Sequence, residues 1–161
     1  MAELTRHGPP EAWPASCPPE WFAGLPVLVG GLGRSGRAAA RHLAEAGADV
    51  VACDDAPDLD TGELAAFGVK THLGPAGPAL LDGRALLVVA PGLPEAHPLI
   101  QGALAAGVPV WSEIELAARV ATPRAWKSTG TRPTACTASV WVPKDSTFQP
   151  ILASRSRAQE S

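Results

Sequence analysis

The sequence predicts an α/β fold in which a mostly parallel sheet is flanked by helices. Short apolar runs alternate with segments whose apolar residues recur at helical spacing, and the connections between them are short. The apolar residues are mainly Ala, Val and Leu, with only three Phe and no Tyr. This composition suits a buried parallel sheet covered by Ala-rich helices. Strands that alternate with helices through short connections imply right-handed crossovers.

The predicted strands are apolar runs that stop at glycine, proline or acidic residues. The first covers residues 27–29 and leads into consecutive glycines, and the second covers residues 49–54. A strong buried strand is expected over residues 85–90, where Pro91 and Gly92 break it, and another over residues 108–111.

The predicted helices follow these strands. They cover residues 35–46, 62–67, 95–106 and 113–120, and Gly47 and Gly68 are plausible stops for the first two. Together with the strands, they indicate a Rossmann-like layered domain over residues 25–121. Residues 1–24 are Pro-rich and are expected to form a flexible arm. Residues 122–161 lose all periodicity and are expected to be disordered.

Composition argues against several classes of partner. The net charge is −3 and no basic stripe is visible, so nucleic acid and membrane surfaces are poor candidates. No secretory signal or membrane span is apparent, which favours the cytoplasm. The three cysteines give neither a disulfide framework nor a zinc pattern, and Cys53 is expected to be buried. The oligomeric state stays open.

A glycine-rich motif lies between the first strand and the first helix. Its three glycines have separate expected roles: a tight turn, close approach of a phosphate, and close packing of helix on strand. Amides at the helix start would face the anion, with the helix dipole in support. The motif reads Gly31-Leu32-Gly33-Arg34-Ser35-Gly36.

The polar residues elsewhere indicate binding rather than catalysis. Asp54 ends the second strand, where it could accept a hydrogen bond from a ribose or a base, so NAD and other nucleotides both remain open. His97 is expected to be a solvated turn residue, and His42 and His72 to lie on helix and strand surfaces. Glu113 and Glu115 fit a helix start. No nucleophile with a base and no metal cluster is recognisable, so no catalytic or metal residue is assigned.

Three ordered segments resemble the Mur ligases, and in particular their D-glutamate-adding branch. They are the strand and glycine turn over residues 27–36, the Pro91-Gly92 and His97-Pro98 segment, and the Trp111-Ser112-Glu113-Ile114-Glu115 segment. The resemblance covers about residues 26–120. It implies the N-terminal domain of a three-domain ligase, which holds the UDP of UDP-N-acetylmuramoyl-L-alanine.

The resemblance also implies roles for individual residues. Gly33, Arg34, Ser35 and Gly36 would meet the diphosphate, with Gly31 in the same turn. Asp54 and Asp55 would border the uridine, and Gly92 would line the cleft. The family often has a polar and a basic residue after the aspartate, whereas this chain has Asp55 and Ala56.

The chain departs from the family where an ATP-binding loop is expected. Thr129, Gly130 and Thr131 start such a loop, but Arg132 and Pro133 follow instead of the Gly-Lys-Thr/Ser end. The intact family uses ATP and Mg²⁺, and this chain is expected to hold no cofactor. We therefore expect a frameshifted or truncated ligase that is inactive alone. The alternatives are an NAD(P)-binding module of a dehydrogenase or regulatory protein, and a gene remnant without a ligand.

Overall fold

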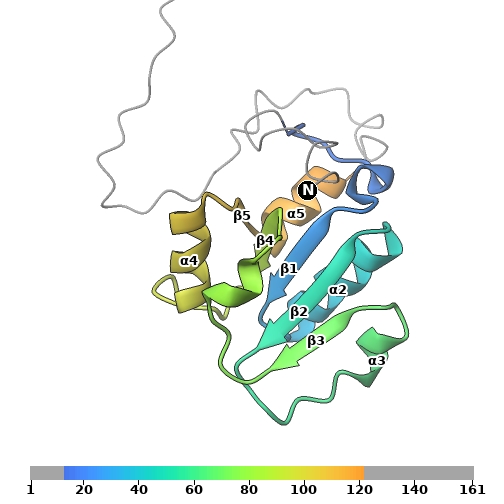
Figure 1. Ribbon diagram of the computed structural model, residues 1–161. Helices are drawn as coiled ribbons and strands as arrows, with labels where there is room; N and C mark the ends of the chain where they lie inside the picture. Colours follow the sequence, from blue (N-terminus) through green and yellow to red (C-terminus); the bar gives the residue numbers. More distant parts are fainter. Residues whose placement is uncertain (1–12, 122–161) are drawn as a thin grey trace, which may run out of the picture.

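The computed structural model describes residues 13–121. Within them, five parallel strands form one sheet in the order β3-β2-β1-β4-β5 (Figure 1). The strands are β1 (Pro26–Gly30), β2 (Asp49–Asp54), β3 (Lys70–Leu73), β4 (Leu86–Val89) and β5 (Val110–Ser112). The expected α/β fold is therefore confirmed. The expected strands match β1, β2, β4 and β5, whereas the sequence pattern predicts no bounds for β3.

The helices follow the predicted order with small changes at their ends. They are α2 (Arg34–Glu45), α3 (Gly62–Ala65), α4 (Pro98–Ala106) and α5 (Glu113–Val120), with 3-10 turns η2 (Pro19–Phe22) and η3 (Pro78–Leu81). The α4 helix begins at Pro98 rather than at residue 95, because proline fits the first turn and His97 caps the helix. The α5 helix has the predicted bounds, and the Ser112 side chain caps it by accepting a hydrogen bond from the Glu115 amide.

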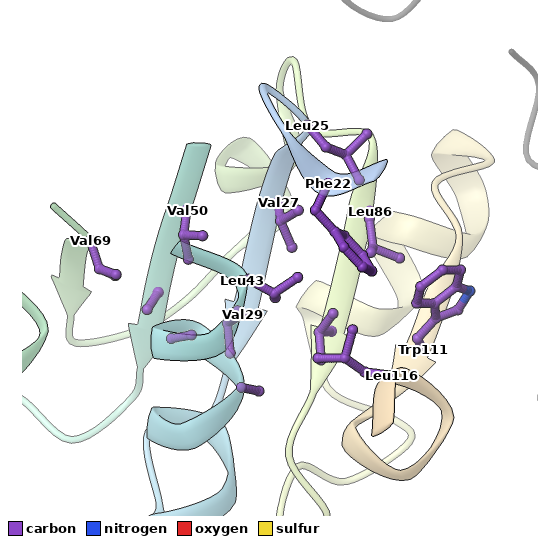
Figure 2. Packing of buried hydrophobic residues seen from close by; sticks show 14 of the residues in the cluster. Phe22, Leu25, Val27, Val29, Leu43, Val50, Val69, Leu86, Trp111 and Leu116 are labelled. Atoms are coloured by element: carbon purple, nitrogen blue, oxygen red, sulfur yellow. The ribbon is translucent and has the colours of Figure 1, made fainter. Parts of the chain in front are cut away.

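Alternate residues of each strand bury opposite faces of the sheet, as the pleat requires. On β1, Val27 and Val29 pack with the face covered by η2, α2, α3 and α5, whereas Leu28 packs with the face covered by α4 and η3. Figure 2 shows the first of these two faces, with Phe22 lying among Leu43, Leu86 and other members of its cluster. The sheet is thus the middle layer of a three-layer sandwich.

The segment over residues 13–24 belongs to this packed domain, although the sequence assigned it to a flexible arm. Phe22 and Cys17 are fully buried, and the Cys17 amide donates a hydrogen bond of 2.7 Å to the Arg119 carbonyl at the end of α5. The ring of Trp13 meets those of Trp21 and Trp111 edge to face. Prolines obscure this packing in the sequence because they are typical of loops.

The strand order places a topological switch beside β1. The chain crosses from β1 through α2 to β2 on one side, and β4 pairs with β1 on the other side. In sheets of this kind, a crevice opens outside the carboxyl ends of the strands at the switch. The segments that follow β1, β2 and β4 meet at this edge.

Candidate functional site

The segment after β1 requires glycine at two positions, Gly31 and Gly36. Gly31 has a φ of +88°, and a Cβ built on it would lie 3.0 Å from the Cβ of Ala90. A Cβ on Gly36 would overlap the Gly31 carbonyl oxygen, so α2 could not start this close to β1. The predicted roles of these two glycines, the turn and the close packing, are therefore visible in the fold.

Gly33 differs from both, because no neighbouring atom lies within 4 Å of a Cβ built on it. It is the N-cap of α2, with ordinary dihedral angles and no capping side chain. The Arg37 amide donates to the Gly33 carbonyl at 3.0 Å, so the amides of Arg34, Ser35 and Gly36 precede the first helical hydrogen bond. Open space therefore adjoins a group of amides at the positive end of a helix dipole, which is the physical basis of an anion site.

Asp54 fixes the glycine turn from the neighbouring strand. Its Oδ2 accepts a hydrogen bond of 2.6 Å from the Leu32 amide, and its Oδ1 accepts one of 2.9 Å from the Ala56 amide. The Gly31 amide adds a third link, a hydrogen bond of 2.8 Å to the Cys53 carbonyl. The carboxylate at the end of β2 thus has a structural use in holding the turn against β2.

Asp55 points elsewhere and joins two other segments. Its Oδ1 accepts a hydrogen bond of 2.9 Å from the Ala76 amide, and its Oδ2 lies 2.9 Å from His97 Nε2. The Ala76 amide and then the His97 side chain lower the pKa of the Asp55 carboxyl by stabilising its charged form. The two aspartates diverge, as adjacent residues at a strand end are expected to do.

His97 is buried, with 8% of its surface exposed, so the expectation of a solvated turn residue is wrong. Its Nδ1 accepts a hydrogen bond of 3.1 Å from the Leu99 amide, which makes it the N-cap of α4. The sequence does carry a signal for this role, because Pro98 directly before an apolar helical pattern marks the residue ahead of it as a cap.

Arg37 also supports the glycine turn, although no sequence motif marks it. Its Nε donates to the Leu32 carbonyl at 2.9 Å, and its Nη1 lies 2.9 Å from Glu63 of α3. The side chain therefore links the glycine turn to α3.

The remaining predicted residues of the site are open to solvent to different degrees. Arg34 is exposed and Ser35 is half-buried at the start of α2. Gly92 is exposed after β4, where the Ala90 amide donates to the Gly30 carbonyl at 2.9 Å.

The other predicted positions have simpler surroundings. Cys53 is buried, as expected, and burial with the charges of Asp55 and Asp54 raises the pKa of its thiol to about 12. His72 is exposed on β3 and His42 is half-buried on α2. Glu113 and Glu115 occupy the first turn of α5. The proposed ATP-loop remnant, Thr129, Gly130 and Thr131, lies outside the described residues.

A separate apolar cleft of about 730 Å³ lies between α4, β5 and α5. Trp111, Leu104 and Val108 contribute to its apolar walls, and Glu115 and Arg119 also line it. The Arg119 guanidinium lies 4.3 Å from the centre of the Trp111 ring and 2.6 Å from Glu115. Of the predicted site residues in the described part of the chain, none lines this cleft.

Residues 13–121 contain neither a metal-binding cluster nor a helix that could cross a membrane. No cluster of three or more His, Cys, Asp or Glu side chains suited to a metal ion occurs among them. None of the helices in this range has the length and hydropathy needed to cross a membrane.

The predicted site residues of the described chain gather at one edge of the sheet. This shared edge lies at the carboxyl ends of the three central strands, beside the topological switch. The β1 turn contributes Gly31, Gly33, Arg34, Ser35 and Gly36, the end of β2 contributes Asp54 and Asp55, and the segment after β4 contributes Gly92.

Comparison with known proteins identifies relatives of this arrangement. A ligase of Myxococcus xanthus is 49% identical over 103 residues, which are 62% of this chain and 23% of the relative. A ligase of Frankia casuarinae is 50% identical over 104 residues, which are 61% of this chain and 21% of the relative. A ligase of Streptomyces coelicolor is 42% identical over 106 residues, which are 63% of this chain and 22% of the relative.

Each of these relatives is named UDP-N-acetylmuramoylalanine–D-glutamate ligase, and the matched part of this chain spans about a fifth of their length. A family model described as "Mur ligase MurD-like, N-terminal domain" matches residues 26–112, which is over half of the chain. The match includes the glycine turn, both aspartates, Gly92 and His97. This chain therefore belongs to the MurD-like N-terminal domain family of the Mur ligases.

Proposed function

We propose that this domain binds the UDP portion of UDP-N-acetylmuramoyl-L-alanine, the substrate of D-glutamate addition in peptidoglycan synthesis. The observation that carries the proposal is the open space at Gly33, beside the amides that start α2. Neither packing nor backbone strain requires a glycine there, whereas close approach of a phosphate does. Membership of the MurD-like family, and the names of the relatives, support UDP as the nucleotide.

The roles of the residues follow from their positions. The amides of Gly33, Arg34, Ser35 and Gly36 receive the diphosphate, because a helix N-terminus offers unpaired donors and a favourable dipole. The exposed Arg34 guanidinium adds positive charge. Asp54 and Asp55 border the uridine, Gly92 lines the same cleft, and Gly31 shapes the turn.

An NAD(P)-binding module is the alternative, and two observations weigh against it. Both carboxylate oxygens of Asp54 already accept backbone hydrogen bonds, so the residue has a structural reason to be acidic. The family match also runs well beyond the glycine turn, to residue 112. The UDP ligand is therefore the better proposal.

We further propose that this chain does not ligate by itself. The residues after Thr131 lack the Gly-Lys-Thr/Ser end that would hold ATP and Mg²⁺. A frameshift near Thr131 explains the abrupt change, and we keep the cytoplasm as the compartment. If neither alternative reading frame of the gene restores Asn-Gly-Lys-Thr and a continuing ligase sequence, the frameshift proposal fails.

Calorimetry with the full chain tests the binding proposal. UDP-N-acetylmuramoyl-L-alanine and NADH are titrated in parallel into wild-type protein and into Gly33→Ala. We expect saturable binding of the UDP ligand to the wild type, weaker binding to Gly33→Ala, and no comparable binding of NADH. A preference for NADH, or no heat with the UDP ligand, would contradict the proposal.

Phosphate release tests the claim about ligation. The full chain is incubated with UDP-N-acetylmuramoyl-L-alanine, D-glutamate, ATP and Mg²⁺, and free phosphate is measured. We expect no turnover above a protein-free control. Sustained release that depends on D-glutamate would show that this chain ligates.

A further inference from the structure

His97 and Asp55 form a contact between segments that are far apart in the sequence. The distance between His97 Nε2 and Asp55 Oδ2 is 2.9 Å, and the imidazole is buried while the carboxylate stays 54% exposed. His97 precedes α4, whereas Asp55 directly follows β2. The pair therefore connects the segments that follow β4 and β2, on either side of β1.

The hydrogen bonds determine which nitrogen of His97 carries the proton. Because Nδ1 accepts the Leu99 amide proton, it must be unprotonated. The ring proton is then on Nε2 and is donated to the Asp55 carboxylate, which only accepts. Each ring nitrogen has one partner, so the orientation of the imidazole is fixed from both sides.

The same pair holds the loop that carries Gly92. This loop is fixed at its start, where the Ala90 amide donates to the Gly30 carbonyl, and within it, where the Leu93 amide donates to the Ala90 carbonyl. At its far end, the His97 amide donates to the Pro94 carbonyl, and the His97 ring reaches across to Asp55. The His97 ring thus gives this end of the loop a hydrogen bond to a segment that is far away in the sequence.

We propose that His97 and Asp55 are a positioning pair, which sets the separation of the Gly92 loop and the β2 end and thereby the width of the nucleotide cleft. This inference rests on the proposed function for its effect on ligand affinity. Asp54 and Asp55 then have separate roles, because Asp54 holds the glycine turn and Asp55 holds the Gly92 loop. The two polar atoms of the imidazole are both engaged, so His97 acts on the ligand through the loop.

Two conservative substitutions separate this role from helix capping. Asparagine is a good N-cap, so His97→Asn keeps an acceptor for the start of α4 but is too short to reach Asp55. Asp55→Asn keeps an acceptor for the Ala76 amide but turns a donor towards the Nε2 proton. His72→Asn, at an exposed histidine of β3, is the matched control.

Ligand affinity is the first readout, measured by calorimetry on the full chain well below its melting temperature. We expect the Kd for UDP-N-acetylmuramoyl-L-alanine to rise about five- to tenfold in each single variant. A change of this size is within the range of interaction energies between two contacting residues. The Kd of the double variant should rise no further than that of either single variant, because both substitutions break the same contact. An unchanged Kd in both folded single variants, even with a lowered melting temperature, would mean that the pair is only structural and would overturn the proposal.

Amide hydrogen exchange is the second readout, and it needs no ligand. His97→Asn should speed exchange at Leu93 and Ala76 at least about tenfold, while Val29 in the central strand and all three sites in His72→Asn stay unchanged. Unchanged exchange at Leu93 and Ala76 would contradict the positioning role. A wild type that fails to bind the UDP ligand defeats the proposed function, whereas the exchange result still decides the role of the pair.

Discussion

Gly33 and Gly36 both lie at the start of α2, yet a methyl group would meet different surroundings at each. At Gly36 it would overlap the Gly31 carbonyl oxygen, and at Gly33 it would enter open space. The backbone of Gly33 is also one that any residue can adopt, with φ −65° and ψ −174°. The packing of the fold thus requires glycine at position 36 but not at position 33.

This contrast predicts opposite phenotypes for two alanine substitutions. Gly36→Ala should lower the free energy of unfolding by about 2 kcal/mol, because α2 or the turn must move to admit the methyl group. Gly33→Ala should change the free energy of unfolding by less than about 0.5 kcal/mol, because a less flexible unfolded chain offsets the loss of a better N-cap residue. Urea unfolding of both variants measures this difference. Equal stability of Gly36→Ala and the wild type would mean that the close packing does not constrain this position.

Asp55 predicts a particular dependence of stability on pH. Its pKa is lower in the folded chain than its usual unfolded value of about 3.9, chiefly through the Ala76 amide. The stabilisation is therefore present above pH ~3.9 and is lost as the pH falls through the lower folded pKa. The stability difference between wild type and Asp55→Asn should be largest near neutral pH and shrink below about pH 4.

Urea unfolding at several pH values measures this dependence. Asp58→Asn, at an exposed aspartate of the same loop, is the control and should change stability little at any pH. A gap between wild type and Asp55→Asn that stays constant from neutral pH to about pH 3 would show that the charge of Asp55 is not its source.

At the scale of elements, the sequence predicted what has a strong periodic pattern and missed what does not. The β2 strand and α5 have the predicted bounds because an apolar run marks β2 and the acidic residues Glu113 and Glu115 mark the start of α5. The β3 strand was not bounded because its residues are mostly exposed and give no apolar run. The segment with η2 was misassigned because its burial depends on partners elsewhere, such as Arg119.

The candidate site shows the same division. The glycine turn and the acidic strand end could be predicted because they are local in the sequence. The contact of His97 with Asp55, and that of Arg37 with Leu32 and Glu63, join residues from different elements. Such contacts depend on the tertiary arrangement, and a single sequence carries no pattern that predicts them.

The packing of η2 indicates that residues 13–24 contribute to the stability of the domain. Phe22 is fully buried between elements of one face of the sheet (Figure 2), so Phe22→Ala should cost about 3 kcal/mol of unfolding free energy. Phe67, with 41% of its surface exposed, is the matched control, and Phe67→Ala should cost less than about 1 kcal/mol. Thermal and urea unfolding compare the two. Similar small losses would mean that residues 13–24 add little to the domain.

At the scale of the whole molecule, the sheet order brings the proposed site residues to one edge. The order β3-β2-β1-β4-β5 puts a switch beside β1, and the glycine turn, the aspartates and Gly92 all follow strands around it. The family match covers these strands and ends at β5. A ligand that spans this edge would contact segments after β1, β2 and β4 together, and so would hold the sheet's central strands in register.

Such a ligand should therefore stabilise the whole domain and not one loop. A ligand at one hundred times its Kd adds about 2.7 kcal/mol to the unfolding free energy, which raises the melting temperature of a domain this size by about 10 °C. We expect this rise with UDP-N-acetylmuramoyl-L-alanine, a smaller one with UDP, and none with NADH, in thermal scans of the full chain. Gly33→Ala should melt like the wild type without ligand but need more ligand for the same rise. If the melting temperature stays the same with every nucleotide, the chain is a folded remnant without a ligand. A ligand that binds the folded domain at this edge must raise the free energy of unfolding, and therefore the melting temperature.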